Sequence, residues 1–246
     1  LALRLLTELK EKVAGLGGIL VALSFLAAAC TASPTPTATP TKAPAGPQQL
    51  SGFANPDLVA TTDWLAAHLS DTDLRVVDLR AAERYQEGHI PGAVNQPLAG
   101  LSETIGGVRG MLIPQAKFEA LMGSLGVGNQ TTVVAVDDDG GVAAARFFWA
   151  LEYYGHSKAQ FLDGGHAKWQ NEGREVTRTV PKVGEAKFTA KPNPLTLALK
   201  EQVLAAIRKP GTVILDVRTA KEYSGEDVRS ARGGHIPGAV NVDWAK

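Results

Sequence analysis

The chain has 246 residues, enough for one or two domains, and its 25 Lys and Arg residues balance its 25 Asp and Glu residues. This zero net charge gives no indication of a nucleic-acid partner or of an anionic surface as a partner. Cys30 is the single cysteine, so a disulfide within the chain is excluded and the region after it holds no cysteine nucleophile.

Residues 1–30 have the features of a signal segment. Lys10 and Lys12 precede a run of apolar and small residues that is short for a membrane span and has the form of a secretory signal core. Three alanines lead directly to Cys30, which resembles a bacterial lipoprotein signal, except that Ala27 stands where leucine is usual. The resemblance implies that Cys30 is lipidated and becomes the mature N-terminus; an ordinary secretory signal or an anchor helix is the alternative.

Residues 31–50 are rich in Pro and Thr and poor in large apolar side chains. Such a stretch cannot bury enough surface to offset chain entropy, so we predict a disordered stalk. A stalk of this kind holds a folded domain clear of a membrane surface. The two segments together predict an extracytoplasmic protein that is lipid-anchored to a bacterial membrane, with a secreted protein as the alternative.

Residues 51–180 are predicted to form one α/β domain. The apolar pattern and the end signals predict helices over 61–69, 114–125, 142–155 and 163–173. Short, nearly continuous apolar runs predict buried strands at 76–79, 131–136 and 161–162. Strands that alternate with helices predict a parallel sheet with helices on both faces.

The octapeptide GHIPGAVN occurs at residues 88–95 and again at 234–241, each time after an apolar run and an Asp-x-Arg motif. The second copy is longer between these landmarks, as expected for a surface-loop insertion. A period of about 140 residues is near domain size, so we interpret the repeat as a duplicated domain. Residues 181–195 are then the linker, and residues 196–246 are the N-terminal part of a second copy.

The repeated residues are predicted to be structural. Buried Asp–Arg pairs and a histidine that closes a turn are common structural devices. The residues concerned are Asp78, Arg80 and His89 in the first copy, with Asp216, Arg218 and His235 in the second. In the turn itself, the first glycine permits positive φ, and the proline presets the turn.

The order of these motifs, followed by FLDGGHAKWQNEGREV from Phe161, resembles a rhodanese domain. The tandem copies resemble the two-domain thiosulfate or 3-mercaptopyruvate sulfurtransferases, and the resemblance covers the chain beyond the stalk. It implies an α/β rhodanese-like domain, with a central parallel sheet covered by helices on both faces, followed by a partial second copy. It also implies transfer of sulfane sulfur from a small sulfur-containing anion to a thiophilic acceptor through a cysteine persulfide, with no cofactor.

In that family the nucleophilic cysteine lies in the loop before the apolar helix, where the helix N-terminus stabilises a thiolate. Here the matching position is Asp137, and Asp138, Asp139, Gly140 and Gly141 follow it. A carboxylate cannot accept sulfane sulfur as a persulfide, so the first copy is expected to be inactive. The aspartates are interpreted as helix caps; a divalent-metal site is the alternative, although no further ligands are identified.

The second copy reaches Lys246 before any counterpart of this loop, so the nucleophilic cysteine is expected beyond that residue. Arg218 and Arg232 are candidates to contact an anionic sulfur donor, although Arg218 is more readily interpreted as a structural partner of Asp216. The alternative function is a non-catalytic, membrane-tethered rhodanese-like binding or scaffold protein whose second loop also lacks cysteine.

Overall fold

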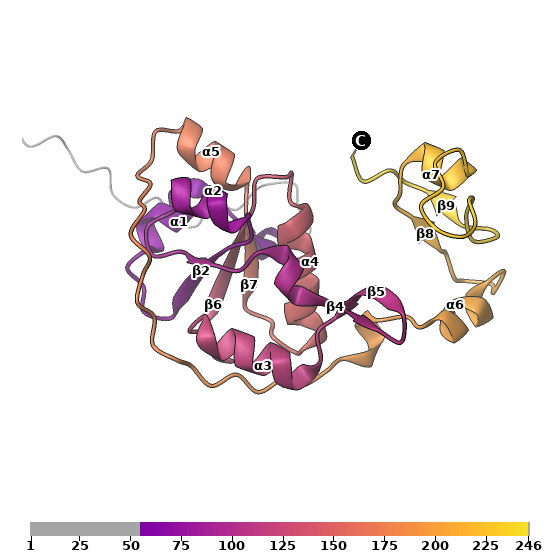
Figure 1. Cartoon of the computed structure of the whole chain (residues 1–246), viewed down its shortest axis with the longest axis horizontal. Helices are drawn as coiled ribbons and strands as arrows, with labels where there is room; N and C mark the ends of the chain where they lie inside the picture. The colour runs from indigo at the N-terminus through magenta and orange to yellow at the C-terminus, as the bar shows by residue number, and fades with distance from the viewer. Residues whose placement is uncertain (1–54, 246) are drawn as a thin grey trace, which may run out of the picture. The chain divides into compact units, whose positions relative to one another are not determined.

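The computed structural model describes residues 55–245, and its first part is built on a five-stranded sheet (Figure 1). Every neighbouring pair of strands in this sheet is parallel, and the strand order is β1-β7-β6-β2-β3. The strands are β1 (Val59–Ala60), β2 (Leu74–Asp78), β3 (Val94–Asn95), β6 (Thr132–Val136) and β7 (Ala159–Leu162). The predicted parallel sheet is therefore confirmed.

Helices cover both faces of this sheet, as predicted. One apolar cluster contains residues of α3 and α4 together with Val77 and Val133, and the other contains residues of α1, α2 and α5 together with Val76 and Val134. Neighbouring residues of a strand point to opposite faces, so the consecutive valines of β2 and β6 contribute to both cores. The helices are α1 (Thr62–His68), α2 (Ala82–Glu87), α3 (Gln115–Ser124), α4 (Val142–Tyr153) and α5 (Gly165–Asn171), with short 3-10 turns η1 (Pro56–Leu58) and η2 (Leu98–Leu101).

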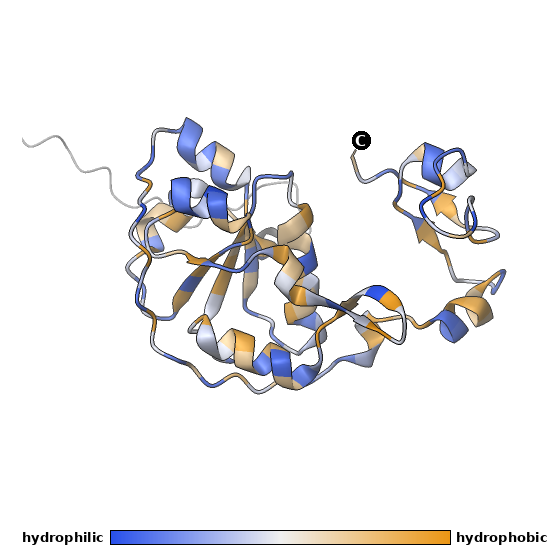
Figure 2. Cartoon of the chain, in the orientation of Figure 1, coloured by the Kyte–Doolittle hydropathy of each residue, from blue (hydrophilic) through white to orange (hydrophobic). Residues whose placement is uncertain are grey.

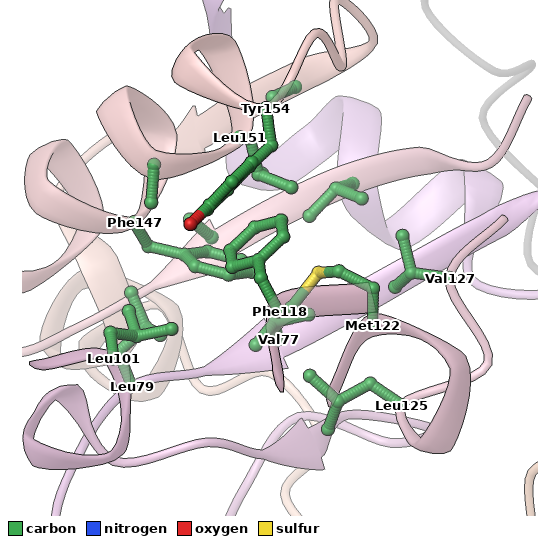
Figure 3. Close-up of a cluster of buried hydrophobic side chains, with 14 of the residues drawn as sticks. Val77, Leu79, Leu101, Phe118, Met122, Leu125, Val127, Phe147, Leu151 and Tyr154 are labelled. Atoms are coloured by element: carbon green, nitrogen blue, oxygen red, sulfur yellow. The ribbon is translucent and has the colours of Figure 1, made fainter. Parts of the chain in front are cut away.

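Large side chains from α3 and α4 fill the first of these clusters (Figure 3). Phe118 stacks on Tyr154 with their ring centroids 4.3 Å apart, and Phe188 meets Phe118 edge-on at 5.7 Å. The Tyr154 hydroxyl donates a hydrogen bond to the carbonyl of Ile113, so the polar end of this buried ring is satisfied. This packing holds α4, and with it the loop that precedes α4, in a fixed position on the sheet.

Along the chain, a β-hairpin that was not predicted from the sequence lies between β3 and α3. Strands β4 (Ser102–Ile105) and β5 (Val108–Leu112) pair antiparallel through a turn at Gly106 and Gly107, which have φ of 58° and 80°. Positive φ at both central residues is the requirement of the tight turn that suits the twist of a hairpin.

The second copy begins after the 3-10 turn η3 (Pro194–Thr196). It contains α6 (Lys200–Ala206), β8 (Leu215–Asp216), α7 (Ala220–Ser224) and β9 (Val240–Asn241), and β8 pairs parallel with β9. Its strands are hydrophobic, as Figure 2 shows, yet Val213, Leu215 and Val217 are all exposed. Between residues 191 and 245, Ala239 is the single buried apolar residue.

The apolar run at residues 213–217 resembles the run that contributes to β2, yet the strand that it forms, β8, has only two residues. Its counterpart β2 pairs with β3 on one side and β6 on the other. Within residues 55–245, β8 has the single partner β9, so only the two residues that face β9 are assigned as strand. An apolar run of this kind predicts a strand, but its length depends on the neighbours that pair with it.

The two copies share one set of contacts around the octapeptide, which is buried in the first copy and partly exposed in the second. Arg80 Nη2 lies 2.6 Å from Asp78 Oδ2 and donates to the Gly88 carbonyl at 2.8 Å. In the second copy Arg218 Nη2 lies 2.6 Å from Asp216 Oδ2 and donates to the Gly234 carbonyl at 2.9 Å. The Asp-x-Arg motif thus ties the end of a strand to the start of the turn in each copy.

The histidine of the turn also makes the same contacts twice. His89 stacks on Tyr85 with centroids 3.7 Å apart and its Nδ1 lies 2.8 Å from the Tyr85 carbonyl oxygen. His235 stacks on Tyr223 at 3.7 Å, with its Nδ1 2.9 Å from the Tyr223 carbonyl. The repeated octapeptide is therefore a folding element, in which these ring nitrogens bond to the backbone.

The first glycine of the turn adopts positive φ outside the extended region in the second copy and not in the first. Gly88 has φ of 164°, which is extended backbone, whereas Gly234 has φ of 91°. Gly92, inside the turn, has φ of 79° and does require glycine.

Arg80→Ala is expected to lower the free energy of unfolding of the first domain by about 3–5 kcal/mol, because it leaves a buried carboxylate without its partner. The side chains of Arg80 and Asp78 are 5% and 1% exposed, whereas those of Arg218 and Asp216 are 42% and 11% exposed. Urea denaturation of residues 50–246, followed by circular dichroism, measures the effect. Arg218→Ala is the matched control and should have a much smaller effect; equal losses in the two variants would contradict this interpretation.

Candidate functional site

The chain reverses direction across the sheet between β2 and β6. It runs outward from β2 to β3 and then returns to β6 on the other side of β2. In parallel α/β sheets, ligand sites lie outside the carboxyl ends of the two strands at such a switch point. Arg80 follows the end of β2, and the loop from Asp137 to Gly141 follows the end of β6. The structure therefore places the acidic loop at the position where a site is expected.

Two carboxylates accept hydrogen bonds from the backbone amides at the start of α4. Asp137 accepts hydrogen bonds from the Gly141 amide at 3.2 Å through Oδ1 and from the Ala144 amide at 3.0 Å through Oδ2. Asp139 accepts from the Ala143 amide at 3.3 Å. These amides have no partner within the helix and would otherwise bind an anion. The loop thus supplies its own anion, which agrees with the interpretation of the aspartates as helix caps.

Burial raises the pKa of Asp137 to about 6, and the hydrogen bond from the Ala144 amide opposes this rise. Contact with the Asp139 carboxyl raises the pKa further. Two carboxyl groups in contact cannot both ionise freely, so they share a proton more readily than isolated groups do. A charged Asp137 is nevertheless stabilised by the amides that it caps.

The remaining carboxylate of the loop, Asp138, forms an ion pair with Arg84 of α2. The Arg84 side chain is 61% exposed and that of Asp138 is 21% exposed, so this pair lies at the mouth of the site. The pair connects the loop to the helix that follows the Asp-x-Arg motif. Its attraction is screened by solvent and contributes little to stability.

The sequence reading missed one buried residue of this site, His166. Its amide donates to the Asp137 carbonyl at 2.8 Å, and its Nε2 has no hydrogen-bond partner within the described part of the chain. Burial, and then the positive charge of Arg80, lower the pKa of His166. Gly165 makes this approach possible, because a Cβ there would lie 2.4 Å from the Asp137 carbonyl oxygen. The motif GGH directly after β7 was the available signal, since parallel strands end at one edge of the sheet.

The acidic loop does not gather a metal-binding set. Among residues 55–245, no group of three or more His, Cys, Asp or Glu side chains is arranged to hold a metal ion. Two of the three aspartates are used as caps and the third pairs with Arg84.

The two arginine candidates of the second copy differ in their contacts. Both border a hollow of about 790 Å³ beside α6, together with His235. Arg218 is held by Asp216 through two hydrogen bonds, of 2.9 and 2.6 Å. The exposed Arg232 side chain makes no hydrogen bond or ion pair with residues 55–245. Arg232 is thus the candidate that remains available to an anion.

The predictions for the signal segment, the stalk and Cys30 concern residues outside the described range. Within residues 55–245, no helix has both the length and the apolar character that crossing a membrane requires.

Comparison with known proteins finds a matching family model and several relatives of this chain. The family model for the rhodanese-like domain matches residues 61–172 and 199–246. Thiosulfate sulfurtransferase of Azotobacter vinelandii is 36% identical over 204 residues, which cover 79% of this chain and 72% of the relative. The sulfur carrier protein TtuD of Thermus thermophilus is 35% identical over 208 residues, with the same shares covered.

Solved structures show the same architecture. The crystal structure of SseA from Escherichia coli, described as a 3-mercaptopyruvate sulfotransferase with the rhodanese fold, matches with a TM-score of 0.71 and 32% identity. The match covers 76% of this chain and 75% of that one. The structure of YnjE matches with a TM-score of 0.68 at 21% identity, which supports the fold alone.

Asp137→Asn is expected to alter how stability depends on pH. The folded-state pKa of about 6 lies above that of an unfolded Asp, so ionisation of Asp137 lowers the free energy of unfolding as pH rises through 6. Relative to the wild type, the variant should therefore gain about 1–2 kcal/mol between about pH 4 and pH 7. Urea denaturation at both pH values measures this gain.

The exposed Asp71→Asn variant is the control for removal of a surface carboxylate. A relative stability of Asp137→Asn that stays constant across this pH range would show that Asp137 does not titrate with a raised pKa.

Proposed function

Because the chain belongs to the rhodanese family, we propose that the whole protein is a sulfurtransferase whose first domain is a structural, catalytically inactive copy. The proposed donor is thiosulfate or 3-mercaptopyruvate, and the proposed acceptor is a thiophile such as cyanide or a thiol. The names of the relatives in Azotobacter vinelandii and Escherichia coli support this substrate class. The main support for an inactive first domain is that the Asp137 carboxylate accepts hydrogen bonds from the amides at the start of α4.

The chemistry of sulfur transfer explains why the first copy is inactive. A thiolate attacks the sulfane sulfur of thiosulfate, the sulfur–sulfur bond breaks, and sulfite leaves with the bonding electron pair. The acceptor then attacks the outer sulfur of the persulfide and the thiolate is regenerated. Asp137 has no sulfur atom that could form a persulfide. Its carboxylate oxygens also accept the hydrogen bonds of the amides that would otherwise bind the donor.

We place the nucleophilic cysteine in the part of the second copy that follows Lys246. The family match extends through residues 199–246, and the aligned region covers 72% of the relative in Azotobacter vinelandii. Arg232 is the proposed contact for the anionic donor, because its guanidinium has free donors that suit a sulfur oxyanion. Arg218 is assigned to the fold through its pair with Asp216.

We further propose that the mature protein is held on the outer side of a bacterial membrane by a lipid on Cys30. The sequence alone supports this proposal, through the apolar segment, the alanines before Cys30 and the Pro- and Thr-rich stalk. Placement outside the cytoplasm would expose the enzyme to sulfur anions of the cell envelope.

Purified residues 50–246 are expected to form no thiocyanate from thiosulfate and cyanide above the protein-free rate, because this segment has no thiol. Asp137→Cys should restore weak turnover at most, since Asp138 and Asp139 would raise the pKa of the new thiol and repel the donor. Turnover by the unmodified segment would overturn the inactive-copy interpretation. Loss of turnover on replacing the first cysteine after Lys246, in the complete reading frame, would support the proposed enzyme; no turnover by that complete protein would favour the scaffold alternative.

Cys30→Ser should abolish incorporation of labelled palmitate when the complete reading frame is expressed in a bacterial host. Cys30 is the single cysteine between residues 1 and 246 and directly follows the signal segment, so its thiol is the one expected to form the thioether to the lipid. Thr31→Ala is the matched control and should keep the label. Unchanged labelling of Cys30→Ser, or an unlabelled wild type, would contradict lipidation at this residue.

A further inference from the structure

A cavity of about 450 Å³ opens beside α4, away from the acidic loop. Its walls come mainly from three segments, the β4–β5 hairpin, α4 itself and the linker that leads to α6, and the start of α3 adds Pro114 and Gln115. Its volume lies within the range of about 300–1,000 Å³ that is typical of small-molecule sites. The lining residues that matter here are Leu112, Arg146, Trp149, Tyr153, Pro192 and Leu197.

Hydrogen bonds fix the three walls to one another. Arg146 Nη2 donates to the Gly110 carbonyl at 2.9 Å, which ties the hairpin to α4. Trp149 Nε1 donates to the Thr196 carbonyl at 2.9 Å, which ties the linker to α4. The cavity is therefore formed before any ligand arrives, so binding would cost little ordering of the chain.

The polar groups of the cavity favour a negatively charged ligand. Arg146 lies over the Trp149 ring, with its guanidinium carbon 4.5 Å from the ring centroid, and burial lowers its pKa. Its one recorded hydrogen bond uses Nη2, so Nε and Nη1 have no partner within the described residues. The Tyr153 hydroxyl also has no hydrogen-bond partner there. The lining contains no acidic side chain, so Arg146 is the one charged residue among apolar and neutral polar walls.

We propose that this cavity is a binding site for an amphipathic organic anion, specifically an aromatic carboxylate. The carboxylate would accept hydrogen bonds from the free donors of Arg146, and the ring would pack on the aromatic and aliphatic walls. This site is independent of the proposed sulfur transfer, because it uses no residue of the acidic loop. Its ligand would contact both the first domain and the linker, and so stabilise the linker on α4.

The test uses the 246-residue chain and 2-naphthoate as the probe, with affinity measured by calorimetry and location by the indole N–H signals in NMR spectra. Saturable binding is expected, with a shift of the Trp149 signal. Arg146→Gln should weaken the affinity by about tenfold or more, because the charge-assisted bonds are lost. Arg109→Gln, which removes an exposed arginine of the same hairpin, should leave the affinity unchanged. The neutral analogue 2-naphthamide should bind about tenfold more weakly than the acid.

Several results would overturn the proposal. These are the absence of saturable binding, equal affinity of the wild type and Arg146→Gln, and equal affinity for the acid and the amide. A shift confined to Trp64, Trp169 or Trp244 would place the probe elsewhere and would equally reject this cavity as the site. A concentration-dependent dimer in sedimentation experiments, with no binding of the probe, would assign the cavity to self-association instead.

Discussion

The buried contact between Asp78 and Arg80 is the constraint on which the rest of the first domain depends. Two opposite charges removed from water must satisfy each other, and Arg80 also reaches the Gly88 carbonyl, so the end of β2 and the start of the turn are fixed together. The turn then directs the chain into β3, and β6 returns on the other side of β2. The same contacts in the second copy explain why one octapeptide occurs twice.

At the switch point created by this arrangement, the anion bound by the helix N-terminus is a side chain of the protein, the Asp137 carboxylate. Asp137 lies on amides that, at a helix N-terminus, would suit a thiolate or an oxyanion of the substrate. The aspartate provides the helix cap, and it has no thiol that could carry sulfur. The copy keeps its core, its loop and its contact with His166, which is consistent with a domain maintained for its structure.

Local sequence signals predicted much of this architecture. They did not predict the contacts between segments that are distant in the sequence. The apolar runs of β2 and β6 and the caps of α4 are local features, and the structure contains them. The β4–β5 hairpin was missed because its short strands are largely exposed, without a continuous apolar run. His166 was missed because only the order of the strands brings it to Asp137. The length of β8 could not be predicted from its own residues, since pairing on both sides is what extends β2.

We propose that a cysteine of the second copy carries the sulfur while the first copy supports the fold. The most direct measurement is mass spectrometry of peptides from the complete protein after incubation with thiosulfate. The account predicts one added sulfur atom on a cysteine that follows Lys246, and none on any peptide from residues 50–246. Turnover with no persulfide beyond Lys246, or with the added sulfur on Cys30, would contradict it.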